Sequence, residues 1–335
     1  MRDITDILTA DEMARVTDKS DLRATLMVAC QYAIVAGIFI VVAIWTNPLT
    51  ILLGTIMLGG RFLGFGVLSH ECGHRACSGR VRLNAFVAEW LLAPASFANN
   101  RAYMRGHWQH HRQAGTENDP DLPNYRDYPI TRARLRRKIK RDITGQTGWR
   151  SVKGIALRLW HIRALDAENR ACILRGLAFN LLLLGILIAA GHPWLYLMWV
   201  AAFVFVNPLV SRLRQVAEHG AVPDLYDADP RQNTRTTYVG PLTRLLFIPH
   251  RVNYHLEHHM LASVPAYRLK TLHEILKANG YYDGVDFPRG YLDMLRRATM
   301  STPVATPTSS WEWRASPALN SRRTRSKTNR HRWRT

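Results

Sequence analysis

The chain has 335 residues, 47% of them hydrophobic, and a formal net charge of +20 at pH 7. Its four cysteines form no Cys-x-x-Cys pair, which argues against a disulfide framework and against a thiolate zinc site. The positive charge would suit nucleic acid or an anionic membrane surface, but the apolar residues are so concentrated that we expect a membrane partner and no nucleic acid.

Two long blocks, residues 24–60 and 176–211, contain no Asp, Glu, Lys or Arg. Because a transmembrane helix needs about 20 apolar residues, each block predicts two spans rather than one. Residues 46–48 and 191–193 carry Asn-Pro and Gly-His-Pro breaks between them. The predicted spans are Leu26–Trp45, Leu49–Ser69, Ile173–Ala190 and Pro193–Val210. Buried helices of a soluble protein are the alternative interpretation.

The charges predict the orientation of these spans. Residues 131–170 hold 12 Lys and Arg against three acidic residues, whereas the two breaks hold none. Basic segments stay in the cytoplasm, so both hairpins should enter and leave from that side. We therefore expect a multi-pass integral membrane protein with both termini and its catalytic face in the cytoplasm.

The segments between and around the spans are predicted as short elements. Residues 1–23 form a lead-in with a short amphipathic helix, and 85–98 are apolar but too short to span, which favours a re-entrant or interfacial segment. Basic surface helices are expected at 131–170, a loop at 221–249, and a helix with an apolar face over Met260–Asn279.

The tail differs in composition from the rest of the chain. From Met300 onward the sequence is rich in Ser, Thr, Pro and Arg, with little apolar pattern. We expect one domain over residues 1–300 and a basic, disordered tail over 301–335.

Eight of the 14 histidines fall into three clusters, one H-x3-H and two H-x2-H-H. On a helix, positions i, i+3 and i+4 share one face, so the members of each cluster should converge. Neutral imidazole binds iron, copper, zinc or nickel, and eight ligands exceed what one ion takes, so we predict two metal ions. The clusters are His70 and His74; His107, His110 and His111; and His255, His258 and His259.

Three residues outside the clusters could complete this site. His219 follows the fourth apolar span as His70 follows the second, which makes it a candidate ninth ligand. Asp119 and Asp121 could orient ligand histidines, although a solvated turn is the default interpretation of their Pro-rich segment.

The first cluster has a second interpretation, because His70-Glu71-x-x-His74 matches H-E-x-x-H. In that motif two histidines bind zinc and the glutamate is the general base of a metalloprotease. An intramembrane zinc metalloprotease is therefore an alternative, but it leaves both H-x2-H-H clusters unexplained. A non-enzymatic metal-binding membrane protein is a more distant one.

The three clusters, together with the apolar hairpins between them, resemble the membrane fatty acid desaturase and hydroxylase superfamily over about residues 20–285. The segment Arg214-x3-Glu218-His219 is similar to one common in its bacterial acyl-lipid and sphingolipid-type desaturases. The resemblance implies an all-α integral membrane protein with four transmembrane helices in two hairpins. It also implies a cytoplasmic helical cap in which the eight cluster histidines and His219 hold a di-iron centre.

The resemblance also implies the reaction. With O2 as co-substrate and electrons from an external donor of ferredoxin or cytochrome type, the enzyme would introduce a double bond into a fatty acyl chain or related lipid. No catalytic residue beyond the metal ligands is implied. An alkyl chain offers no polar handle, so a narrow apolar tunnel, expected between the second and fourth spans, must position it. A hydroxylase or ketolase of the same superfamily remains the nearest alternative.

Overall fold

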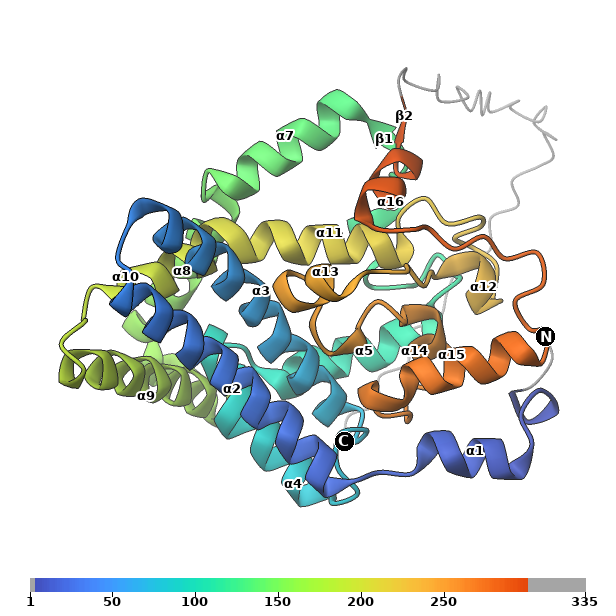
Figure 1. Cartoon of the computed structure of the whole chain (residues 1–335), viewed down its shortest axis with the longest axis horizontal. Helices are drawn as coiled ribbons and strands as arrows, with labels where there is room; N and C mark the ends of the chain where they lie inside the picture. Colours follow the sequence, from blue (N-terminus) through green and yellow to red (C-terminus); the bar gives the residue numbers. More distant parts are fainter. Residues whose placement is uncertain (1–3, 301–335) are drawn as a thin grey trace, which may run out of the picture. The chain divides into compact units, whose positions relative to one another are not determined.

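The structure, a computed structural model, describes residues 4–300, and the predicted tail at 301–335 lies outside them. The fold is helical, as predicted, with a pair of two-residue parallel strands, β1 (Ile130–Thr131) and β2 (Thr299–Met300). Four helices are long and apolar enough to cross a membrane (Figure 1). They are α2 (Asp21–Ile44), α3 (Pro48–Gly73), α9 (Ala167–Ala189) and Leu195–His219, which joins α10 (Leu195–Ala201), η5 (Ala202–Val206) and α11 (Asn207–His219).

Both predicted hairpin breaks are confirmed, and local chemistry explains each. The side chain of Asn47 accepts hydrogen bonds from the amides of Leu49 and Thr50, and Pro48 occupies the first helical position, where its missing N–H costs nothing. Gly191 adopts a φ of +78° after α9, a conformation that favours glycine at a helix end.

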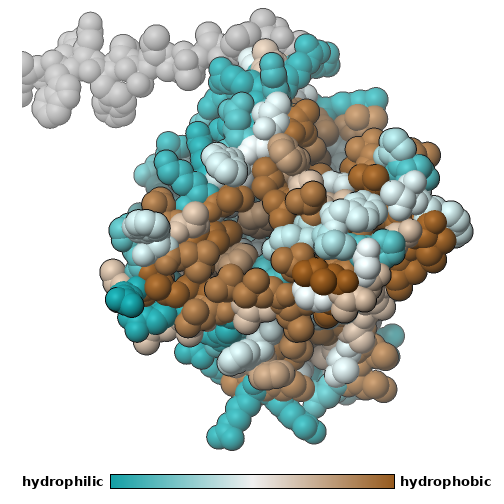
Figure 2. Space-filling model, turned by 90° about the vertical axis from the view of Figure 1, so that its left-hand side faces the viewer, coloured by the Kyte–Doolittle hydropathy of each residue, from teal (hydrophilic) through white to brown (hydrophobic). Residues whose placement is uncertain are grey.

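Helix α3 lies at the centre of the bundle. Its apolar window is 61% buried, against 28% in α2 and α9 and 33% in the fourth span, so the other three face the surroundings. A Cβ at Gly59 would overlap the side chain of Val206, and one at Gly60 would overlap the carbonyl of Leu246. Small residues thus allow the close helix contacts typical of membrane bundles. Hydrophobic side chains gather over much of the face that carries α9 and α10 (Figures 1 and 2).

A cap of helices adjoins the C-terminal end of α3, and its two most important members here are α5 (Asn100–Gln113) and α14 (His255–Met260) (Figure 1). The expected amphipathic lead-in is α1 (Ala10–Thr17), and the expected basic helices are α7 (Arg132–Ile143) and α8 (Gln146–Trp160). The other short elements are η1 (Ile4–Asp6), α6 (Leu122–Tyr125), η4 (Ile162–Ala164), η6 (Pro249–Arg251), η7 (Ala266–Arg268) and α16 (Tyr291–Arg297).

The short apolar segment after the first cluster, expected to be re-entrant or interfacial, is helical, as α4 (Val81–Phe86), η2 (Val87–Leu92) and η3 (Ala93–Ser96). Two other local predictions differ from the structure. The expected loop at 221–249 contains α12 (Pro230–Asn233) and α13 (Pro241–Leu246), both begun by proline at the first helical position. The helix expected from Met260 begins only at α15 (Leu269–Ala278), because Pro265 disfavours helical geometry in the residue before it.

Candidate di-metal centre

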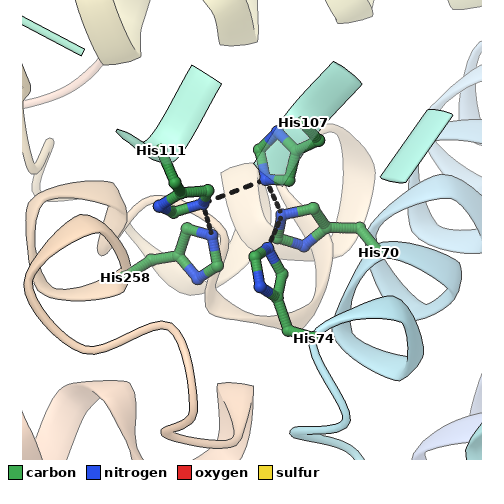
Figure 3. A group of neighbouring side chains, drawn as sticks. All are labelled: His70, His74, His107, His111 and His258. Atoms are coloured by element: carbon green, nitrogen blue, oxygen red, sulfur yellow. Dashed lines mark hydrogen bonds between the residues drawn. The ribbon is translucent and has the colours of Figure 1, made fainter. Parts of the chain in front are cut away.

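The nine histidines predicted as ligands lie in two groups, and in each group one ligand atom per residue lies within 4.8 Å of the others. Seven of the nine side chains are buried and two are half-buried. The first group, drawn in Figure 3, consists of His70, His74, His107, His111 and His258. The second group consists of His110, His219, His255 and His259.

Each H-x2-H-H cluster serves both groups, which corrects the expectation that its three histidines converge on one point. On α5, His107 and His111 are one turn apart and join the first group, while His110 joins the second. On α14 the division is reversed, because His258 joins the first group and the i, i+4 pair of His255 and His259 joins the second. Positions i and i+4 differ by only a small rotation about the helix axis, whereas i+3 falls to the other side of position i.

Carboxylate and carbonyl oxygens behind the rings hold two histidines of the second group in place. His110 Nδ1 lies 2.8 Å from Asp119 Oδ1, and His219 Nδ1 lies 3.1 Å from the carbonyl oxygen of Asn233. An acceptor at this position keeps the proton on Nδ1, so the lone pair of Nε2 points into the group.

Glutamates occupy the corresponding positions behind two more rings. Glu71 Oε1 lies 3.3 Å from His70 Nδ1, and Glu218 Oε1 lies 3.5 Å from His255 Nδ1. Glu218 is itself paired with Arg214, one helical turn earlier, at 2.5 Å. Both carboxyl groups are buried beside the rings that they contact.

The inward nitrogens approach one another closely. His70 Nε2 lies 2.7 Å from His107 Nε2, and His219 Nε2 lies 2.9 Å from His255 Nε2. Where the Nδ1 atoms keep the protons, these contacts bring lone pairs together, which is favourable only with a cation between them. The residues present therefore fit metal ions, one in each group.

Burial favours the neutral form of five of the nine rings. Loss of hydration lowers the pKa of these five histidines below its usual value, and the charge of neighbouring histidines lowers it further. Neutral imidazoles carry the free lone pair that a metal needs. This holds for His107, His111, His255, His258 and His259.

The interpretation of Asp119 as a residue of a solvated turn is wrong. Its side chain is buried, and besides His110 it accepts hydrogen bonds from the backbone amide of Asp121 and the hydroxyl of Tyr125. Burial alone would raise the pKa of Asp119, but these hydrogen bonds outweigh it and hold the pKa below its usual value. The ring of Tyr125 also stacks on His219, with centroids 4.7 Å apart. Asp121 is half-buried beside His110.

A cavity of about 260 Å³ borders the first group. His70 is part of its wall, and so is Tyr103, whose ring stacks on His107 with centroids 5.3 Å apart. The second span contributes much of the wall, as expected, but the segment 92–103 contributes most of the rest, and Arg214 comes from the fourth span. Its apolar wall residues are Leu63, Gly66, Val67, Leu92, Ala93 and Ala98.

The sequence matches the Fatty acid desaturase family over residues 22–290, which is most of the chain. The chain belongs to this family. The match spans all four long helices and all nine histidines. Membership makes the protein an oxidoreductase and removes the zinc metalloprotease alternative.

Curated relatives of this desaturase-family protein are distant and chemically diverse. A beta-carotene ketolase from Paracoccus sp. is 26% identical over 275 residues, covering 76% of this chain and 95% of the relative. An sn-1 oleoyl-lipid 12-desaturase from Picosynechococcus sp. is 24% identical over 302 residues, covering 83% and 82%. A dihydrorhizobitoxine desaturase from Bradyrhizobium elkanii is 23% identical over 272 residues, covering 76% and 75%.

The residues that support the centre of this desaturase-family protein are largely ones that sequence patterns miss. Glu257, which lies within the third cluster, contacts residues outside the two histidine groups. It accepts hydrogen bonds from His273 Nδ1 and the Tyr282 hydroxyl, both at 2.5 Å, and from the hydroxyl of Thr236. This buried network anchors α14 from behind. His273, Tyr282 and Thr236 lie far from the clusters in sequence, so no spacing pattern could reveal them.

Proposed function

We propose that this protein is an O2-dependent di-iron enzyme that introduces a double bond into a fatty acyl chain or a related lipid. The observation that carries the proposal is the pair of largely buried histidine groups, the first of which borders a cavity with a mainly apolar wall. The family assignment supports the same chemistry. We further propose that the cap and both termini lie in the cytoplasm, following the distribution of basic residues.

The eight cluster histidines and His219 are the proposed iron ligands. Nitrogen donors suit several transition metals, and iron is the one whose redox chemistry serves a desaturase. When bound, the two irons would supply O2 activation and the abstraction of hydrogen from an unactivated C–H bond. Around them, Asp119, Glu71 and Glu218 would keep the rings in one tautomer and orientation.

The cavity is the proposed site of the reacting methylene groups. Its wall at Leu63, Val67 and Leu92 is apolar and would exclude water from the substrate chain. Gly66 lines the same space, and a Cβ there would have no atom within 4 Å, so the absence of a side chain leaves room for a chain to lie. His70 and Tyr103 place this space directly against the first histidine group.

Ketolation or hydroxylation is the second candidate. The observation that favours it is the relationship to beta-carotene ketolases, which extends over 95% of the length of one such relative. Desaturation, ketolation and hydroxylation all begin with the removal of hydrogen from a C–H bond, so the histidine groups do not distinguish these reactions. Substrate position relative to the metals decides the outcome.

The test is expression of the chain in a host that supplies a compatible ferredoxin or cytochrome, followed by mass spectrometry of the lipids. A new species lighter by two hydrogen atoms supports desaturation. A product heavier by one oxygen atom (a hydroxyl group), or by one oxygen atom less two hydrogen atoms (a ketone), with no product that has only lost two hydrogens, would exclude desaturation and support the second candidate. A His258→Ala variant in the same host is the control, because it removes a proposed ligand.

A further inference from the structure

Helix α7 presents a row of cationic side chains that no acidic group compensates. Arg132, Arg136 and Lys140 are spaced four residues apart and therefore share one face, with Arg137 beside them. All four are exposed, and none forms an ion pair with any residue between 4 and 300. Exposed cations without partners generate a local positive potential that extends into solvent.

The next helix has a different surface, and the contrast indicates what each surface faces. Helix α8 exposes Trp149, Leu157 and Trp160 next to Arg150 and Lys153. Tryptophan interleaved with basic residues is typical of a helix lying at a membrane interface.

The exposed face of α7 lacks that apolar component. Within α7, all of which the structure describes, Ile143 at the last position is the one exposed large hydrophobic side chain. In Figure 1, α7 lies at the edge of the molecule, with one long side free. A purely cationic face fits a soluble, acidic partner better than it fits the acyl region of a membrane.

The inner side of α7 is connected to the second histidine group. Leu135 belongs to the same buried cluster as Tyr125, whose ring stacks on His219. Asp142, at the end of α7, is buried and pairs with Arg212 on α11, the helix that ends at His219. Buried side chains thus connect the inner side of α7 to the second histidine group.

We propose that this face of α7, formed by Arg132, Arg136, Arg137 and Lys140, docks a small acidic protein that carries one electron at a time. The proposal rests on the proposed function, which consumes electrons from outside the chain. Reduction of O2 to two waters takes four electrons and four protons, and the two hydrogens lost by the substrate supply half of each. Two carrier molecules, each oxidised by one electron, supply the other two electrons, and the solvent supplies two protons.

The test uses the full-length, iron-loaded protein in discs of zwitterionic phosphatidylcholine, with a strongly acidic plant-type [2Fe–2S] ferredoxin as probe. Binding is measured at several salt concentrations and needs no turnover. Arg136→Glu/Lys140→Glu should lower the association rate by about tenfold or more at low salt, and the difference should disappear at high salt. The matched control, Arg150→Glu/Lys153→Glu on α8, reverses the same number of charges and should stay within about twofold of the native chain.

Two outcomes would overturn the proposal. One is native-like ferredoxin binding in the α7 variant, and the other is an equal loss in the α8 control. If the charge reversal on α7 weakened binding to discs of anionic lipid but left ferredoxin binding unchanged, the lipid surface would be the occupant. That result would also overturn the proposal. If the charge reversal impairs folding, Arg136→Gln/Lys140→Gln serves the same comparison, with a smaller expected loss. If ferredoxin bound in a salt-sensitive way that depends on α7, but expression of the protein gave no lipid product, the docking proposal would stand and the proposed reaction would fail.

Discussion

Asp119 offers the sharpest test of how the second histidine group is held. Its carboxylate accepts hydrogen bonds from His110 Nδ1 at 2.8 Å, from the Asp121 amide at 2.8 Å and from the Tyr125 hydroxyl. In Asp119→Asn the remaining oxygen can still accept the first two, and the hydroxyl of Tyr125 can turn to accept from the new amide group. The variant therefore keeps the size of the side chain and its hydrogen bonds, and it loses the negative charge beside His110.

The expected loss follows from that single change. Removing the group that orients a ligand histidine typically lowers metal affinity or activity by about 10- to 100-fold, which corresponds to about 1.4 to 2.7 kcal/mol. We expect this loss of affinity to be smaller than the loss caused by removing a ligand, because His110 itself remains. We expect chelator competition on the purified Asp119→Asn protein to show weakened binding of one metal ion, with unchanged helix content.

Asp127→Asn is the matched control for this measurement. Asp127 lies in the same loop region, but its side chain is 44% exposed and pairs with the equally exposed Arg134. Exposed ion pairs of this kind contribute about 0–1 kcal/mol to the free energy of unfolding. We therefore expect the loss of this pair to leave metal binding unchanged. Unchanged metal affinity and activity in Asp119→Asn would refute the orienting role, and equal losses in both variants would show that the effect is not specific.

Three further outcomes are expected. His219→Ala should lower the iron content from about two atoms per chain toward one, by elemental analysis, because it removes a donor of the second group; full iron content with full activity would exclude the ninth ligand. Gly66→Leu should lower turnover of long substrates while retaining iron, because the side chain enters the cavity, whereas Gly185→Leu, also free of neighbours within 4 Å, should not. Cysteines introduced at Asn47 and His192 should react with an impermeant thiol reagent only from the non-cytoplasmic side; reaction from the cytoplasm alone would contradict the proposed orientation.

The long helices could be predicted because the bilayer imposes a simple length and composition rule. The residues at which these helices begin and end were harder to predict. Helix α2 begins at Asp21, five residues before the predicted span, because the side chain of Ser20 caps it and its first turn is polar. The fourth span was expected to end at Val210, yet its helix continues without a break to His219. Hydropathy marks where a helix leaves the membrane, not where it stops.

The histidines could be found from their spacing, but their partition could not. Whether His110 joins His107 or His219 depends on how α5, α11 and α14 cross, and no local pattern contains that information. The same limit applies to Asp119, which looks like a turn residue because its neighbours are prolines and acids. Its role appears only when folding buries it against His110.

The partition of the clusters has a consequence for assembly. Helix α5 contributes histidines to both groups, and so does α14, while α3 contributes only to the first group and α11 only to the second. A shift of α5 or α14 would therefore disturb both groups together, whereas a shift of α11 would act mainly on one. The carboxylates follow the same logic, since Asp119 and Glu218 both act on the second group and Glu71 acts on the first. The two shared helices make the two groups one structural unit, and the cavity adjoins that unit on one side, at His70. In the proposed reaction, metals held by the two groups would carry out the oxidation, and the cavity wall would set which carbon is presented to them.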